Sequence, residues 1–387
     1  MLCILRSPFP CALAIAFALL LGTAQAQTEW NASDGAPLDW FGYAVATQGD
    51  WAVAGAPFES EAGARAGAVY VLDQASGVEV KLLPSSSAPG GHFGSAVDLD
   101  GDTLVVGAPA DGLGGQAPGK AYVFEYLGGS WQQVAQLQGS PGAAGDGLGT
   151  SVAVHGDRIL VGAPWDATAG IQAGAVWAFR RQAGVWIADG QLAVNQTRPG
   201  DFYGYAVALG ERWACVGAYS ANSVVYNEGA AYLFDHSGGS YAFAARVTEP
   251  SPMPNTNFGR SVSLAGDRLA VGATHDSAGL QESGRVTLFR FDGNAWTLEA
   301  SVQPNLPQAG NAFGFAVSLA GDRLLVGAPL TGGSGAAYLF EPIQGSWYET
   351  RSPDFAGTQP GDFVGVSVAL GSGWGLVGAM RDASLGW

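Results

Sequence analysis

Short runs of alternating apolar and polar residues recur along the chain from about residue 41 to its end. In residues 93–109, two such runs lie between Gly94 and Gly107 and meet at Gly101-Asp102. Alternation with a period of two is typical of strands with one buried face, and Asp-Gly or Gly-Asp pairs favour tight hairpin turns. The stretch therefore predicts two paired strands.

Close copies of this stretch start near residues 41, 93, 148, 203, 258, 313 and 364. Each copy has two glycines that are 13 residues apart. Glycine is expected where inner strands are crowded or a turn is tight, because it has no side chain. The first glycines are Gly42, Gly94, Gly149, Gly204, Gly259, Gly314 and Gly365, and the second are Gly55, Gly107, Gly162, Gly217, Gly272, Gly327 and Gly378.

Two further strands complete each repeat. A third strand follows a glycine such as Gly119, and a fourth opens on an aromatic residue such as Trp131. Repeats two to five are each 55 residues long, so they contain no insertions. Four strands per unit at this period predict an all-β fold, a seven-bladed β-propeller of four-stranded antiparallel blades over residues 27–387.

The repeated residues also resemble a known family. Phe-Gly followed by Gly-Ala-Pro, as at Phe93-Gly94 and Gly107-Ala108-Pro109, is similar to the FG-GAP repeat of integrin α-subunit propellers and their bacterial relatives. The resemblance covers about nine tenths of the chain. It implies a secreted or cell-surface module that binds protein or glycan, as in cell adhesion.

The two ends of the repeat region do not match fully. Residues 27–40 align with the tail of a fourth strand, so they are expected to supply the outer edge of blade seven. After Gly378, residues 381–387 stop before a third strand. The sequence therefore predicts a last blade that is incomplete at the C-terminus.

Residues 1–26 have the pattern of a secretory signal peptide. Arg6 precedes an apolar run, and Ala24-Gln25-Ala26 is a small-residue cleavage site. The run is shorter than the ~20 residues of a membrane-spanning helix, and no later stretch is long enough. We expect a secreted protein, in the extracellular space, the periplasm or on the cell surface, whose remaining cysteine, Cys215, is a buried small hydrophobe.

The chain is acidic, with 33 acidic against 17 basic side chains and a formal charge of −16. Such a charge disfavours nucleic acid and anionic lipid as partners. The chain is 48% apolar and 13% charged, which indicates a folded protein rather than a disordered one.

The calcium loop of integrin-type propellers, Asp-x-Asp-x-Asp-Gly-x-x-Asp, is not matched. Asp98-Leu99-Asp100-Gly101-Asp102 comes nearest, but the fixed spacing of the glycines leaves room only for a tight turn. We therefore expect hairpin turns, no metal site and no cofactor.

Two series of carboxylates recur in the loops. One lies three residues before the first glycine, and the other lies four residues after the second glycine; both are expected on one face of the propeller. They either close turns by accepting backbone hydrogen bonds or form a ring that binds ligands or cations. The first series is Asp39, Asp146, Asp201, Asp362 and the amide Asn311; the second, our candidate ligand-binding set, is Glu59, Asp111, Asp166, Asp276 and Asp382.

Sequence motifs of catalysis are absent: there is no His-Glu-x-x-His, no Gly-x-Ser-x-Gly and no phosphate loop. The four histidines are scattered and are expected in turns or on the surface. A binding module is therefore favoured over the alternative, an extracellular enzyme acting on polysaccharides or esters. Exposed aromatic residues on one face would support binding, and titratable groups around one channel mouth would support the enzyme.

Overall fold

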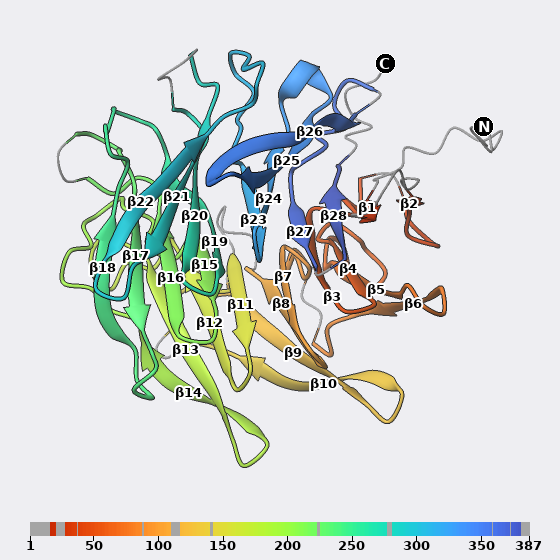
Figure 1. The fold of residues 1–387 in the computed structure, drawn as a ribbon. Coiled ribbons are helices and arrows are strands. Elements are labelled where there is room, and N and C mark those ends of the chain that lie inside the picture. The colour runs from red at the N-terminus through yellow and green to blue at the C-terminus, as the bar shows by residue number, and fades with distance from the viewer. Residues whose placement is uncertain are drawn as a thin grey trace, which may run out of the picture.

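The structure, a computed structural model, describes residues 16–20, 28–36, 38–86, 89–109, 117–139, 142–222, 225–276, 281–357, 359–371 and 373–380. Strands dominate it, and within these ranges the single helical segment is the 3-10 turn η1 (Thr331–Gly333). Neighbouring strands of every sheet run antiparallel. An all-β propeller of four-stranded antiparallel blades is therefore confirmed (Figure 1).

Six sheets each take four strands that follow one another along the chain. In five of these repeats the first strand lies between the first glycine and the hairpin turn, whereas in the fifth repeat it begins at Phe258, one residue before Gly259. Each second strand ends one residue after the second glycine. The first strands are β3 (Ala44–Gln48), β7 (Ala96–Asp100), β11 (Ser151–His155), β15 (Ala206–Leu209), β19 (Phe258–Ala265) and β23 (Ala316–Ala320); the second are β4 (Trp51–Ala56), β8 (Thr103–Ala108), β12 (Arg158–Ala163), β16 (Trp213–Ala218), β20 (Arg268–Ala273) and β24 (Arg323–Ala328).

The third and fourth strands form the outer half of each of these sheets. Each third strand begins directly after the predicted glycine. The third strands are β5 (Ala68–Asp73), β9 (Lys120–Leu127), β13 (Ala175–Gln182), β17 (Ala230–Asp235), β21 (Arg285–Phe291) and β25 (Ala336–Ile343); the fourth are β6 (Val78–Leu82), β10 (Ser130–Leu137), β14 (Val185–Gln191), β18 (Ala242–Val247), β22 (Trp296–Val302) and β26 (Ser346–Ala356).

A further sheet combines both ends of the chain in the order β2-β1-β28-β27. β27 (Val368–Leu370) and β28 (Trp374–Gly378) come from the seventh repeat, and β2 (Thr28–Trp30) lies at the outer edge, as the alignment of residues 27–40 predicts. The third place, which the sequence left open, is taken by β1 (Ala16–Leu20). β1 lies inside the predicted signal peptide; the rest of that segment lies outside the described residues.

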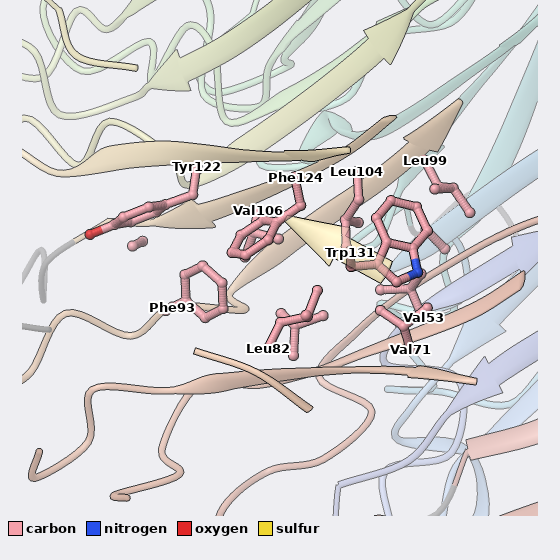
Figure 2. Packing of buried hydrophobic residues seen from close by; sticks show 13 residues of the cluster. Val53, Val71, Leu82, Phe93, Leu99, Leu104, Val106, Tyr122, Phe124 and Trp131 are labelled. Atoms are coloured by element: carbon pink, nitrogen blue, oxygen red, sulfur yellow. The ribbon is translucent and has the colours of Figure 1, made fainter. Parts of the chain in front are cut away.

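The hydrophobic core lies between neighbouring blades. One cluster joins Val53, Val71 and Leu82 of the first repeat to Phe93 and Trp131 of the second (Figure 2). Phe93 is fully buried, and its ring meets Tyr122 edge to face at 5.3 Å. Because each blade buries its neighbour's face, the repeats depend on one another for their stability.

The predicted hairpin at residues 98–102 is confirmed. β7 and β8 pair from Asp100 with Thr103 onwards, and Gly101 at the turn has a φ of 56°. Cys215 is fully buried in β16, as expected, and burial raises the pKa of its thiol.

Candidate functional site

The clearest candidate site is the channel mouth at which the first strands begin. The residue that follows each first glycine reaches this mouth, so all seven repeats contribute one side chain to it. Together they line an open cavity of about 230 Å³. These residues are Tyr43, Ser95, Thr150, Tyr205, Arg260, Phe315 and Val366.

Aromatic rings gather on two sides of this mouth. On one side Trp40 stacks on Tyr43, with ring centroids 5.8 Å apart and planes at 21°, and Phe58 meets Trp40 at 4.2 Å. On the other side Phe202 stacks on Tyr219, with centroids 5.1 Å apart and planes at 13°. We call these groups the aromatic platforms; each is partly exposed.

The backbone carries some of these rings in an unfavourable conformation. Two residues before the first glycine, the chain adopts a positive φ, which is 57° at Trp40, 54° at Phe202 and 51° at Phe363. The other repeats adopt a positive φ at the same position, with Gly147 and Asn257, which tolerate this region, and with His92 and Ala312. A bulky side chain at such a φ costs on the order of 1–3 kcal/mol, and such strain clusters at functional sites.

Arg260 is the cation of the mouth. Its guanidinium lies 4.1 Å from the centroid of the Phe315 ring and 5.2 Å from that of Tyr205. Nη1 of Arg260 also donates a hydrogen bond of 2.8 Å to the hydroxyl of Tyr205. The pKa of Tyr43 is raised above its usual value, mainly by burial and to a smaller extent by the nearby Tyr205. The positive charge of Arg260 opposes this rise.

The channel interior is lined mainly by aliphatic side chains, unlike the mouth. A cavity of about 310 Å³ is lined by the first strands, whose side chains here are small and apolar except at a few positions. Oδ2 of Asp98 accepts a hydrogen bond of 2.7 Å from the backbone N–H of Val154 in the next blade. Ser263 and Ser318 make the equivalent bonds to Leu319 and Leu370. Burial raises the pKa of Asp98 to about 7.

The candidate acidic ring is only partly described. Two of its members, Asp111 and Asp382, lie outside the described residues. The other three occupy equivalent loops after the second strands and are buried, with exposed fractions of 7% for Glu59, 2% for Asp166 and 2% for Asp276. Each described member has partners close by, so its charge is not freely presented to solvent. A role of these residues in ligand binding stays a prediction.

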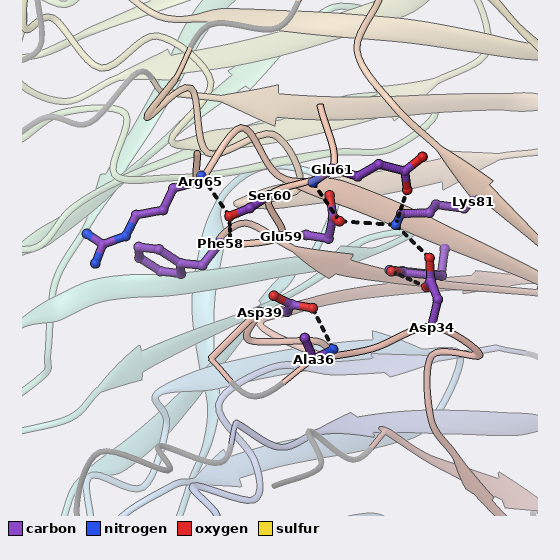
Figure 3. A network of polar contacts seen from close by, with 10 residues as sticks. Asp34, Ala36, Asp39, Phe58, Glu59, Ser60, Glu61, Arg65 and Lys81 are labelled. Atoms are coloured by element: carbon purple, nitrogen blue, oxygen red, sulfur yellow. Dashed lines mark hydrogen bonds and ion pairs between the residues drawn. The ribbon is translucent and has the colours of Figure 1, made fainter. Parts of the chain in front are cut away.

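The partners of these three carboxylates come largely from their own repeats. Oε1 of Glu59 accepts from the backbone N–H of Glu61 and pairs with Nζ of Lys81 at 3.1 Å (Figure 3). Oδ1 of Asp166 accepts from the N–H of Thr168, and Asp276 pairs with Arg285 at 3.3 Å. This bonding is typical of loop-closing residues.

Lys81 joins three acidic residues in the same network. Its ammonium lies 2.7 Å from Asp34, 2.7 Å from Glu61 and 3.1 Å from Glu59 (Figure 3). Burial alone would lower the pKa of Lys81, but these hydrogen bonds raise it above its usual value. Lys81, which lies in strand β6, thus neutralises part of the acidic charge of the first loop.

The first carboxylate series has one shared geometry. Each of its four aspartates accepts a hydrogen bond from the backbone N–H three residues earlier, at 2.6–2.9 Å, which closes the loop before the first strand. Burial raises the pKa of Asp39, Asp146 and Asp201. The pairs are Asp39 with Ala36, Asp146 with Ala143, Asp201 with Arg198 and Asp362 with Gln359.

The opposite end of the channel has a larger hollow, which several titratable side chains line. A cavity of about 810 Å³ is lined there by His155, Glu211, Arg212 and Asp267 among others. Arg212 pairs with Asp235 at 2.8 Å, and Asp267 accepts from the indole N–H of Trp213. Nδ1 of His155 lies 3.9 Å from Asp100, so three of these four titratable groups have structural contacts.

His236 lies at a turn, as the sequence predicts, but its side chain is buried. It follows β17 and is only 6% exposed, because Tyr241 packs on its ring and Nε2 lies 2.9 Å from the carbonyl of Gly210. Burial lowers the pKa of His236.

Within the described ranges, no group of three or more His, Cys, Asp or Glu side chains is placed to hold a metal ion. No helix in this part of the chain is long and apolar enough to cross a membrane.

The sequence reasoning missed the aromatic platforms and Arg260. A signal was present: the position after the first glycine carries Tyr43, Tyr205 and Phe315, residues larger than its small neighbours in the strands. Position-by-position comparison of the repeats would have found it.

Comparison with known proteins agrees with this architecture. A search of curated proteins finds no match. The sequence model of the FG-GAP repeat matches residues 26–72, 77–124, 131–179, 186–234, 242–289 and 296–340. Each matched unit runs from the region of one blade's outer strand to the third strand of the next blade, so consecutive units interlock. With six matched repeats folded into propeller blades, this chain belongs to the FG-GAP repeat family, whose repeats resemble those of integrin α-subunits.

Proposed function

We propose that this FG-GAP propeller is a secreted or cell-surface module that binds protein or glycan through the channel mouth and its aromatic platforms. FG-GAP propellers are generally associated with binding, which sets the class of function. The observation that carries the proposal is the pair of partly exposed aromatic platforms beside this mouth, where Trp40 stacks on Tyr43 and Phe202 stacks on Tyr219. The positive φ at Trp40 and Phe202 is shared by every repeat and belongs to the turn, so what sets these two residues apart is their large, partly exposed rings.

The platforms also have the composition of a binding surface. Aromatic side chains supply large, rigid contact area and are enriched among the residues that dominate binding energy. Partly exposed rings at one mouth match the feature that favours binding over catalysis. The cavity of about 230 Å³ is small, so a ligand would insert one group there and spread over the platforms.

Substitution of strained aromatic residues tests the proposal. Trp40→Asn and Phe202→Asn place at each site a residue that another repeat, at Asn257, already uses. Screened on immobilised polysaccharides and extracellular proteins, both variants are expected to lose about tenfold in affinity for the ligand that the wild type retains. Their melting temperatures should be unchanged or higher, because backbone strain is relieved.

A matched control is Tyr348, which is 53% exposed. It lies in β26, the outermost strand of its blade, whereas the first strands line the mouth. Tyr348→Asn should bind like the wild type. Equal binding by all three variants would remove the mouth as the site.

The alternative function is an extracellular enzyme acting on polysaccharide or ester substrates. It is favoured by the opposite hollow, where His155 and Glu211 line a cavity of about 810 Å³. Turnover of such substrates that is lost in Glu211→Gln and His155→Ala, but kept in Trp40→Asn, would support the enzyme.

We further propose secretion through cleavage after Ala26. The leader pattern of residues 1–26 supports this, and cleavage would remove β1 and leave one edge of β28 without its present partner. Mass spectrometry of the exported protein should find residues 27–387. An intact N-terminus on the exported protein would contradict the proposal.

We also infer that the propeller closes as seven blades, with β27 and β28 as the inner strands of the seventh. Its contacts with the first repeat support this: Oγ of Ser367 donates to the carbonyl of Gly42 at 2.8 Å, and Nε1 of Trp374 donates to that of Gly49 at 3.0 Å. Ser151 makes the same kind of contact with Gly204 between two complete blades. A crystal structure with six or eight blades would contradict it.

A further inference from the structure

We propose that the channel mouth binds the carboxylate of an acidic polysaccharide, with Arg260 as the residue that recognises the charge. This inference rests on the proposed binding function and names the class of ligand. It takes a uronic acid unit to lie over the mouth, with its carboxylate on the guanidinium of Arg260 and neighbouring sugar rings on the aromatic platforms.

The guanidinium of Arg260 is held in place but not saturated. Phe315 at 4.1 Å and Tyr205 at 5.2 Å pack on it, and one Nη1 hydrogen bond goes to Tyr205. A guanidinium has five N–H donors in a fixed planar fork, so several remain for a ligand. This fork matches the two oxygens of a carboxylate.

Arg260 also has no ion pair with the described residues, whereas other arginines that pack on aromatic rings or strands do. Arg181 pairs with Glu125 at 2.9 Å, and Arg268 pairs with Asp322 at 2.6 Å. No carboxylate among the described residues lies within ion-pair distance of Arg260, although the chain carries 33 acidic side chains. A guanidinium at the channel mouth without a carboxylate partner offers a local site for one anionic group.

The lining hydroxyls favour a sugar over an acidic peptide. Oγ of Ser95 donates to the carbonyl of His92, and Oγ1 of Thr150 donates to that of Gly147, both at 2.7 Å. Each hydroxyl keeps lone pairs that accept hydrogen bonds, so the lining suits a ligand rich in O–H donors. The flat rings of Trp40 and Phe202 provide faces for the C–H surfaces of pyranose rings.

Titration calorimetry with a hexamer of galacturonate and its fully methyl-esterified form tests the inference. The ester keeps the sugar but removes the charge. The wild type should bind the acid hexamer at least tenfold more tightly than the ester. Added salt should weaken binding of the acid but not of the ester. Arg260→Gln should bind the acid at least tenfold more weakly than the wild type and the ester equally well. Arg260→Lys, which keeps the charge without the fork, should fall between.

The matched control is Arg212→Gln at the opposite end of the channel. The guanidinium of Arg212 also packs on an aromatic ring, 4.5 Å from the centroid of Trp213. The variant therefore removes a similar cation–π contact at a place away from the mouth. It should bind both hexamers like the wild type, and melting curves of all variants check the fold.

Equal affinity for acid and ester, failure of the wild type to bind the acid, or wild-type binding by Arg260→Gln would overturn the inference. So would tighter binding of a hexa-aspartate peptide, which would make the ligand a protein. The proposed function has its own test and still stands if Trp40→Asn and Phe202→Asn lose affinity for the ligand that the wild type binds in the screen. The two proposals can therefore fail separately.

Discussion

At the scale of single residues, the glycines of the repeat are explained by contact between blades. A Cβ on Gly162 would lie 2.0 Å from the carbonyl oxygen of Gly204, and one on Gly55 would lie 2.0 Å from that of Gly94. The sequence predicted crowding at these positions, and that prediction is confirmed. It could not show that the obstacle is the first glycine of the next repeat, because this contact exists only after neighbouring blades have packed together.

Gly162→Ala is therefore expected to be strongly destabilising. The clash is with backbone, which cannot move away easily, so we expect the free energy of unfolding to fall by about 3 kcal/mol or more. Gly156→Ala is the matched control: Gly156 has a φ of 55° but nothing within 4 Å, and its replacement should cost about 1 kcal/mol. Chemical denaturation measures both, and equal losses would contradict the packing account.

Asp98 gives the channel interior a dependence on pH. Burial raises its pKa in the folded state to about 7, above its usual value of 3.8, so the folded state favours the protonated form. Its contribution to stability is therefore present at acid pH and is lost as the pH rises from about 4 to 7.

Asp98→Asn should remove this dependence, because the amide oxygen still accepts from Val154 but carries no charge. The melting temperature of the variant should exceed that of the wild type by a margin that grows from pH 5 to pH 8. A margin that stays constant over this range would contradict the assignment.

At the scale of elements, the strands could be predicted well and the loops less so. Hairpins such as β7–β8 follow from local alternation and a turn dipeptide, so they were confirmed. The stacking of Phe202 on Tyr219 could not be derived, because 17 residues separate rings that meet only when the loops before and after the strand pair fold together. β1 was missed for a related reason: its partner β28 lies at the other end of the chain.

The loop carboxylates allow a prediction at this scale. Asp166 is 2% exposed and accepts from the N–H of Thr168. Asp166→Ala should lower the free energy of unfolding by roughly 1 kcal/mol through the lost hydrogen bond. Asp166→Asn keeps an acceptor and should be milder, and neither should change ligand affinity. Binding weakened in a salt-dependent way at unchanged stability would instead restore the acidic ring as the site.

At the scale of the whole molecule, the propeller brings one side chain from each repeat to a common mouth. The aromatic platforms around Tyr43 and Tyr205 come from segments some 160 residues apart, and Arg260 from a third repeat lies between aromatic neighbours. Repeat counting predicted the architecture, yet the chemistry of the mouth depends on the few positions at which the repeats differ.

Hydrogen–deuterium exchange of the wild type tests most directly whether this mouth is the binding surface. It is measured with and without the polysaccharide or extracellular protein that the wild type binds in the screen. Amides in exposed loops exchange readily and become protected when a ligand covers them. The account predicts slower exchange at residues 38–43, 202–205 and 219–222, which carry the aromatic platforms. Protection confined to the outer strands β6, β10 and β14, or to the hollow around Glu211, would contradict it.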